Sequence, residues 1–309
     1  MHRRPSNLVK AVTALASVAL LASCAGCEAR VYGTPGQDAP QMSVVAPQAP
    51  VETPAAPPIQ AAASFAGLQM RAQLAVDEAA DRGAEVGLMV LDRETRQEVT
   101  AGTTSRWATA SVVKLFIADD LLLRQPNLSP TDRALFDVML RSSDDSAAET
   151  FWNRGGGSAI INRVTARYGL TNTSPPSNGR WFNTLTSAQD LVRYYDMLLS
   201  GKGGLPPERA NMIMSNLAAS TPTAPDGTQP GGIYPQRFGI PEGLYAEPVA
   251  VKQGWMCCVR SDWMHLSTGV VGPNRRFIMV IYALQPSGAE SARATITQAV
   301  KTTFPGGKI

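Results

Sequence analysis

The chain has 309 residues, of which 44% are hydrophobic and 17% are charged. That apolar fraction is enough for a sizeable buried core, and the charged fraction is too low for a disordered polymer. The formal net charge is +3, and Arg3, Arg4 and Lys10 in the acid-free N-terminal leader account for all of it. The rest of the sequence has no excess positive charge, so we expect no nucleic-acid partner.

The first residues have the pattern of an export signal. The basic residues just named precede an apolar run over 11–22, which is too short to span a bilayer. The Leu-Ala-Ser-Cys sequence that ends at Cys24 resembles a bacterial lipobox, whose cysteine carries acyl chains such as palmitate. We expect a signal peptide over 1–23 and a lipid anchor at Cys24. Cys27 is a second candidate, and an ordinary secretory signal is the alternative.

Seven prolines lie among alanine and glutamine between residues 28 and 64. Because this composition cannot form a core, we expect a Pro/Ala-rich tether over 24–64. At roughly 3 Å per residue, it could hold the domain up to about 100 Å from the membrane. We therefore expect an exported protein on the outer face of the cytoplasmic membrane, reaching into the cell wall.

From Ser64 onward the pattern is globular, and we expect one domain over 65–309. The first predicted helix covers 65–82, with Leu68, Leu74 and Val76 on its apolar face. The next predicted elements are a strand over 86–91, a polar turn over 92–97 and a returning strand near Val99. The sequence over about 111–217 is mostly helical. Three strands over 248–255, 263–271 and 277–284 and a closing helix over 290–303 complete the domain.

Two early strands and three late ones, with helices at both ends, predict an α/β (α+β) sandwich. Its sheet would be mostly antiparallel and flanked by the terminal helices, with an all-helical subdomain inserted over about 111–217. The junction of the two parts is where we expect the cleft.

The adjacent pair Cys257 and Cys258 lacks the ligand spacing of a zinc site. In an oxidising compartment the two thiols either form a vicinal disulfide or are small buried residues, and we favour the buried interpretation. Beyond the leader there is one histidine, His265, which lies in a strand-like run. A lone strand histidine is more often packed than catalytic, so neither a Ser-His-Asp triad nor a metal site or cofactor is expected. Nucleophilic catalysis would need a lysine base.

Ser111 and Lys114 supply that possibility. On a helix, positions i and i+3 share a face, so the hydroxyl and the amine can approach each other. A serine in the first turn has free backbone N–H groups beside it, and these can stabilise an oxyanion. The apolar run that follows Ser111 predicts a buried helix, and burial would lower the pKa of Lys114.

Two further motifs follow in the sequence. Ser143-Asp144-Asp145 ends a helical run, and Lys252-Gln253-Gly254 lies on a late strand. Their order and spacing resemble the Ser-x-x-Lys, Ser-Asp-Asn and Lys-Thr-Gly motifs of penicillin-recognising enzymes. Residues 183–187 and 239–241 are similar to class A β-lactamases. The domain therefore resembles the serine β-lactamase and penicillin-binding protein family, and this resemblance implies that family's fold. Segments 116–121, 245–258 and 263–270 more closely resemble a mycobacterial alanine-rich lipoprotein.

The family resemblance implies roles for these residues. Ser111 would attack the carbonyl of a β-lactam or of a D-Ala-D-Ala stem peptide of peptidoglycan, and Lys114 would take and relay its proton. Ser143 would pass a proton to the leaving nitrogen, and Lys252 would hold the site electropositive for a substrate carboxylate. The N–H groups of Ser111 and Trp255 would form the oxyanion hole.

The sequence departs from the family's pattern in three ways. Asp145 stands where the family has Asn, which would favour a charged Lys114 and repel a substrate carboxylate. Gln253 replaces the family's small hydroxyl residue, which helps to bind that carboxylate, and Trp255 adds bulk beyond Gly254. By their positions in and beside the motifs, we expect substrate to contact Asp145, Lys252, Gln253, Gly254 and Trp255. No Glu occurs between Glu149 and Glu208 to activate water. These changes predict an acyl-serine domain impaired in hydrolysis; the alternative is a catalytically inactive lipoprotein that binds peptidoglycan or a partner, so whether it is an enzyme stays open.

Overall fold

The computed structural model describes residues 60–229 and 231–309. The predicted signal peptide, both candidate lipidation sites and residues 24–59 of the predicted tether lie outside the described residues. The first helix, α1 (Gln60–Ala80), begins before residue 65 and so includes the last residues that we assigned to the tether.

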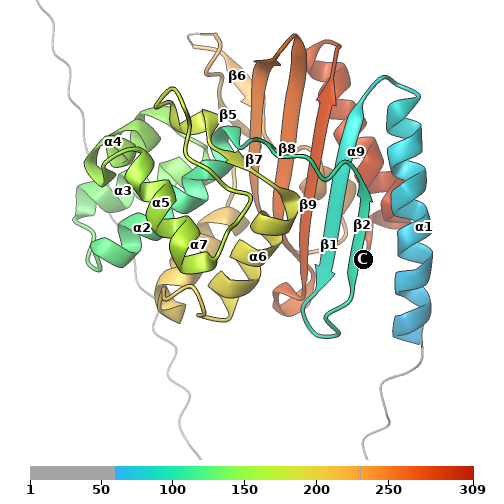
Figure 1. The fold of residues 1–309 in the computed structure, drawn as a ribbon, viewed down its shortest axis with the longest axis horizontal. Helices are drawn as coiled ribbons and strands as arrows, with labels where there is room; N and C mark the ends of the chain where they lie inside the picture. The colour runs from blue at the N-terminus through green and yellow to red at the C-terminus, as the bar shows by residue number, and fades with distance from the viewer. Residues whose placement is uncertain (1–59, 230) are drawn as a thin grey trace, which may run out of the picture. The chain divides into compact units, whose positions relative to one another are not determined.

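Five strands form one antiparallel sheet in the order β2-β1-β9-β8-β7 (Figure 1). Their bounds are Glu85–Asp92 for β1, Glu98–Gly102 for β2, Val249–Val259 for β7, Asp262–Val271 for β8 and Phe277–Gln285 for β9. Since β9 lies between β1 and β8, the two early strands and the three late strands share one sheet. The predicted mixed fold with an antiparallel sheet is confirmed.

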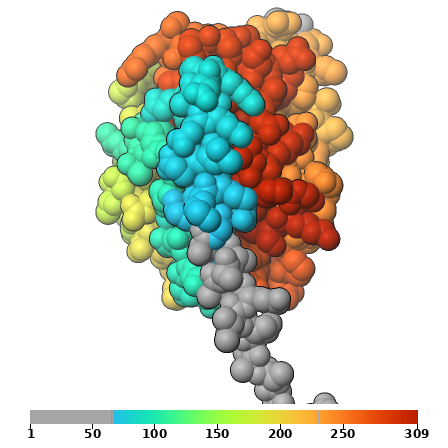
Figure 2. All heavy atoms as spheres, turned by 90° about the vertical axis from the view of Figure 1, so that its right-hand side faces the viewer, coloured from blue at the N-terminus to red at the C-terminus, as the bar shows by residue number. Residues whose placement is uncertain are grey.

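Helices α1 and α9 (Ala289–Thr303) pack together on one face of this sheet (Figures 1 and 2). The buried face of α1 is formed by Leu68, Ala72, Ala75 and Ala79, at the spacing of one helical stripe. Our prediction for Leu74 was wrong, because its side chain is 51% exposed. The small alanines let the backbone of α1 lie close to its neighbours, so this face depends on residues that hydropathy ranks low. No helix among the described residues is long and apolar enough to cross a membrane.

The middle of the chain is mostly helical, as predicted. The helices are α2 (Lys114–Arg124), α3 (Pro130–Arg141), α4 (Asp145–Gly155), α5 (Ser158–Tyr168), α6 (Ala188–Leu199) and α7 (Pro207–Ala218). Helix α6 differs from our description of one helical subdomain, because it packs against β1 and β9. The hydroxyl groups of Tyr195 on α6 and Thr268 on β8 lie 3.0 Å apart. The helical insertion therefore also covers the second face of the sheet.

Several short elements lie outside our predicted elements. They are the strand pair β3 (Trp107–Ala108) and β4 (Leu185–Thr186), the hairpin of β5 (Thr223–Pro225) and β6 (Ile233–Pro235), and α8 (Ile240–Gly243). Strands of two or three residues are too short to show a period of two, so they have no recognisable sequence pattern.

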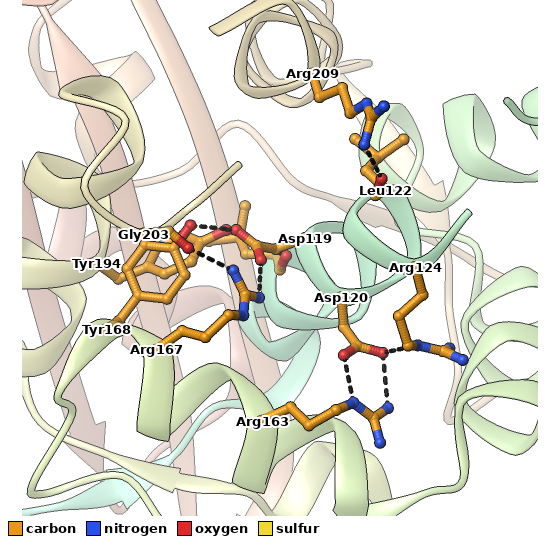
Figure 3. Close-up of polar contacts among 11 residues, drawn as sticks. Asp119, Asp120, Leu122, Arg124, Arg163, Arg167, Tyr168, Tyr194, Gly203 and Arg209 are labelled. Carbon is orange, nitrogen blue, oxygen red and sulfur yellow. Dashed lines mark hydrogen bonds and ion pairs between the residues drawn. The ribbon is translucent and has the colours of Figure 1, made fainter. Parts of the chain in front are cut away.

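Two adjacent buried carboxylates hold α2 in place (Figure 3). Asp119 accepts hydrogen bonds from Arg167 and Tyr168 on α5. Asp120 pairs with Arg163, whose Nε lies 2.7 Å from its Oδ1. Because buried carboxylates are stable only when they are paired and hydrogen-bonded, these contacts fix α2 relative to α5, and with it the first residue of α2.

Candidate active site

Ser111 and Lys114 lie together at the start of α2. Ser111 is in a 3₁₀ helix, Ala110–Val113, and Lys114 is the first residue of α2. The Nζ atom of Lys114 lies 2.8 Å from Oγ of Ser111, so the two side chains meet as the i, i+3 spacing predicted. Lys114 is fully buried, and this burial is the largest influence on its pKa, which lies below the ordinary value for lysine.

Ser143 joins this pair from the turn between α3 and α4. Its backbone has a φ of 58°, in the left-handed region that is uncommon for residues other than glycine. In this conformation both Ser143 oxygens accept from Lys114, the carbonyl at 2.7 Å and Oγ at 3.2 Å. The next residue, Asp144, caps α4 by accepting from the N–H of Ala147 at 2.7 Å. Residues at such strained positions often have a functional role.

Lys252 reaches the same serine from β7. Its Nζ lies 2.8 Å from Oγ of Ser143 and 3.0 Å from the carbonyl oxygen of Gln253. Burial, followed by the nearby charge of Lys114, lowers the pKa of Lys252 well below that of a free lysine. The three sequence motifs therefore converge at Ser143, which lies between the two amines.

Asp145, at the start of α4, pairs with one of these amines. Its Oδ1 lies 2.5 Å from Nζ of Lys114, and this contact opposes the effect of burial by favouring the charged lysine. Within residues 60–229 and 231–309, Asp145 forms no ion pair with Lys252. The carboxylate therefore balances the charge of a protonated Lys114 and does not bridge both lysines.

Gly254 allows β7 to approach Ser111 closely. A Cβ atom at this position would lie 2.5 Å from the carbonyl oxygen of Thr109 and 3.1 Å from the backbone nitrogen of Ser111. The neighbouring Trp255 stacks on Tyr234 of the β5–β6 hairpin, with 3.7 Å between ring centroids. The strand is thus fixed against the serine on one side and against the hairpin on the other.

A cavity of about 240 Å³ opens beside Ser111. Four of the eight predicted catalytic and substrate-binding residues line it, namely Ser111, Ser143, Asp145 and Trp255, and Trp181 and Gly227 line it as well. Gln253 is not among the lining residues: its side chain is 3% exposed, and its Nε2 lies 3.5 Å from the carbonyl oxygen of Phe238. Because side chains alternate along a strand, Gln253 points away from its neighbour Lys252. The structure does not support our expectation that the Gln253 side chain contacts substrate.

Two residues of the cavity wall, Trp181 and Gly227, were not among the predicted site residues. The ring of Trp181 lies over Nζ of Lys114, 4.8 Å from its centroid, and its Nε1 donates to Glu149 at 2.9 Å. Gly227, in the β5–β6 hairpin, faces Asp145, whose Oδ2 would lie 2.9 Å from a Cβ added there. Both residues come from segments between the predicted elements, where neither periodicity nor a motif marked them.

His265 is a packed residue, as expected. It is fully buried on β8, and its Nε2 lies 2.7 Å from the hydroxyl of Tyr234. Burial lowers its pKa to about 3. Among the residues that the structure describes, no cluster of three or more His, Cys, Asp or Glu side chains could hold a metal ion.

Cys257 and Cys258 form a disulfide with each other, and both are exposed. Our preference for buried thiols was therefore wrong. The β7–β8 register shifts between Met256 and Val259, so the two cysteines lie where β7 leaves the regular sheet. Cys257 lines the cavity beside Ser111.

Comparison with known families agrees with this geometry. Residues 120–304 match the Beta-lactamase2 profile, described as a "Beta-lactamase enzyme family". The match covers more than half of the chain. The chain belongs to this family. The matched range begins after Ser111 and Lys114, so the family assignment does not depend on these two residues.

Relatives that align with this chain from end to end are found in mycobacteria. Proteins of Mycobacterium tuberculosis and Mycobacterium bovis, both named "Putative lipoprotein LppW", are 56% identical to this chain over 324 aligned positions, which cover 100% of each chain. The resemblance to a mycobacterial lipoprotein is confirmed.

Solved structures share the fold of this Beta-lactamase2 member at much lower identity. TLA-3 extended-spectrum β-lactamase has a TM-score of 0.60 at 14% identity, covering 76% of this chain and 98% of its own. PBP-A has a TM-score of 0.61 at 16% identity, covering 78% and 95%. The class A β-lactamase from Mycobacterium abscessus has a TM-score of 0.56 at 18% identity, covering 74% and 98%. At these identities the likeness extends to the fold alone.

Proposed function

We propose that Ser111 forms an acyl-enzyme with β-lactams or with D-Ala-D-Ala stem peptides of peptidoglycan, and that this acyl group is released slowly. The observation that carries the proposal is the 2.8 Å contact between Nζ of Lys114 and Oγ of Ser111, at a cavity open to ligand. A variant of PBP-A, which has the same fold, is known as an acyl-enzyme complex with penicillin G.

Lys114 acts as the base when its amine is neutral, a state that burial favours. The amine takes the proton of Ser111, and Oγ attacks the carbonyl carbon of the ligand. Ser143 lies within hydrogen-bonding distance of both amines, so it can pass a proton from Lys114 to the leaving nitrogen. Lys252 orients the hydroxyl of Ser143 for this transfer.

Release of the acyl group needs a base that activates water. No carboxylate among the described residues that line the cavity is free to do so. Among the described residues that line the cavity, the one carboxylate is that of Asp145, and its Oδ1 is held by Lys114. Glu149 lies nearby but accepts from Nε1 of Trp181. Since no Glu occurs between Glu149 and Glu208, we expect hydrolysis of the acyl group to be slow.

A fluorescent penicillin tests this proposal. Full-length protein incubated with the probe is expected to give one labelled band on a denaturing gel, because an acyl-serine survives denaturation. Ser111→Ala should remove the band, whereas Ser291→Ala, at an exposed position on α9, should keep it. Labelling that persists in Ser111→Ala would refute the assignment of Ser111.

We also propose that Cys24 is diacylated and becomes the new N-terminus when residues 1–23 are removed, with Cys27 as the alternative. The domain would then stand on the outer face of the cytoplasmic membrane and reach into the cell wall through the tether. The mycobacterial relatives are named lipoproteins, and this supports lipid anchoring. Metabolic labelling with an alkyne fatty acid should be lost in Cys24→Ala and kept in Cys27→Ala; the reverse pattern would assign Cys27.

A second candidate function is non-catalytic binding of peptidoglycan or of an envelope partner. The Lys114–Asp145 ion pair favours it, because a protonated Lys114 cannot take the proton of Ser111. In that case sedimentation with purified peptidoglycan would be unchanged by Ser111→Ala, and the fluorescent penicillin would label nothing.

A further inference from the structure

We infer that the cavity beside Ser111 binds a ligand with a cationic or neutral group next to Asp145 more tightly than a ligand with an anionic group there. This inference rests on the proposed function for its site and names the class of substrate. Of the thirteen described residues that line the cavity, Asp145 alone has a charged side chain. The feature that would attract a substrate carboxylate, an accessible positive charge, is absent from that lining.

Both lysines of the site lie beneath the cavity wall. Lys114 is 0% exposed and Lys252 is 1% exposed, and neither lines the cavity. The contacts of Lys252 are internal, to Oγ of Ser143 and to the carbonyl oxygen of Gln253. Because Lys252 is buried, a ligand carboxylate could reach this amine only if neighbouring side chains moved. Gln253 offers no second contact, because its side chain lies outside the cavity lining.

The carboxylate of Asp145, in contrast, is accessible. Its side chain is 53% exposed at the start of α4, although Oδ1 is held by Lys114. Oδ2 faces the hairpin at Gly227, on the cavity wall. An ammonium or amide N–H of a ligand can donate to this oxygen, whereas a ligand carboxylate at the same place is repelled.

The surface that continues outward from the cavity has the same bias. A shallow groove shares Asp145 and Trp181 with the cavity, and its remaining charged residues are Glu149 and Arg180. Two carboxylates and one guanidinium thus line this groove. Arg180, the one positively charged residue of the groove, is not among the cavity residues. The ligand bound most tightly is therefore one that bears an ammonium or a carboxamide at the position nearest Asp145.

Three penicillins that differ in one group test this inference. They are benzylpenicillin, which is anionic, its neutral carboxamide, and its aminoethyl amide, which is cationic. Binding to full-length Ser111→Ala, which cannot be acylated at residue 111, is measured by tryptophan fluorescence, since Trp181 and Trp255 line the cavity. We expect the cationic ligand to bind about tenfold more tightly than the anionic one, from the Coulomb interaction at a partly exposed site.

Adding Asp145→Asn to this variant should abolish or invert the preference. Adding Glu208→Gln, which removes an acidic residue from the first turn of α7, should preserve it. Equal or tighter binding of the anionic ligand, a preference that survives Asp145→Asn, or no binding of any of the three would overturn the inference. Acylation of the wild type is followed separately by mass. If the wild type is not acylated but the variant keeps its binding preference, the proposed function is overturned and this inference stands.

Discussion

The Nζ atom of Lys114 lies 2.5 Å from Oδ1 of Asp145, so the candidate base is also one half of an ion pair. Burial lowers the pKa of Lys114, and the carboxylate raises it. The balance between these two effects decides how much neutral amine is available to activate Ser111. It is therefore the feature of the site that most directly controls reactivity.

Asp145→Asn should increase acylation near neutral pH. Removing the carboxylate removes an influence that raises the pKa of Lys114, so this pKa falls further and the neutral amine is present at lower pH. The rising part of the pH–rate profile should move toward acid. At pH values below the plateau, the acylation rate should increase about tenfold for each pH unit by which the profile moves. The test is the rate of adduct formation between about pH 6 and pH 9, with Glu208→Gln as control. An unchanged profile would show that Asp145 does not govern the base.

Gly254→Ala should damage the site by steric conflict. The added Cβ would lie 2.5 Å from the carbonyl oxygen of Thr109, so β7 must move away from Ser111. We expect a loss of about 1–3 kcal/mol in the free energy of unfolding and at least a tenfold slower acylation. Gly288→Ala is the control, because nothing lies within 4 Å of a Cβ there. Equal behaviour of the two variants would contradict the close approach of β7.

The sheet and the main helices could be predicted because their residues show the periods of strands and helices over long segments. Leu74 was misplaced because hydropathy favours leucine, whereas the α1 interface is built from small residues such as Ala72 and Ala75. Ser111, Lys114 and Lys252 could be located from motifs. Trp181 could not, because its place over Lys114 depends on how a loop between helices folds back.

The conformation of Gln253 could not be read from its motif either. The motif suggested a residue beside the substrate, but the strand turns this side chain toward Phe238. The exposure of Cys257 and Cys258 depends on the irregular end of β7, which hydropathy does not reveal.

Acid should destabilise the domain through His265. Its pKa is about 3 in the folded state and 6.5 ordinarily, so the unfolded chain binds a proton that the folded chain excludes. This contribution to stability is complete above pH 6.5 and is lost as the pH falls toward 3. We expect a loss of about 2–3 kcal/mol between about pH 6.5 and pH 4.5, at roughly 1.4 kcal/mol per unit. Urea unfolding at the two pH values measures it.

His265→Gln should flatten this dependence. Asp92 and Asp132 do not obscure the result, since their pKa values are lowered to about 2 and they affect stability only below their ordinary value of 3.8. An equally steep loss in His265→Gln would mean that another group titrates.

Cys257 and Cys258 should resist alkylation until they are reduced. Trypsin cleaves after Lys252 and Arg260, so both cysteines fall in the peptide 253–260. Because the cysteines are paired with each other, this peptide should be lighter by two hydrogens than its dithiol form and should carry no iodoacetamide. After reduction it should carry two. Full alkylation of the unreduced protein, unfolded in urea at a pH where a free thiol is partly ionised, would contradict the disulfide.

Intact-mass analysis over time, after mixing full-length protein with benzylpenicillin, tests acylation at Ser111 most directly. Since the amine of Lys114 contacts Ser111, and since no described residue that lines the cavity offers a free carboxylate to activate water, we expect a gain of one penicillin mass. This adduct should be absent from Ser111→Ala and should persist for hours once free drug is removed. Protein that stays unmodified while the drug remains intact would contradict acylation, and unmodified protein with rapidly consumed drug would contradict slow release.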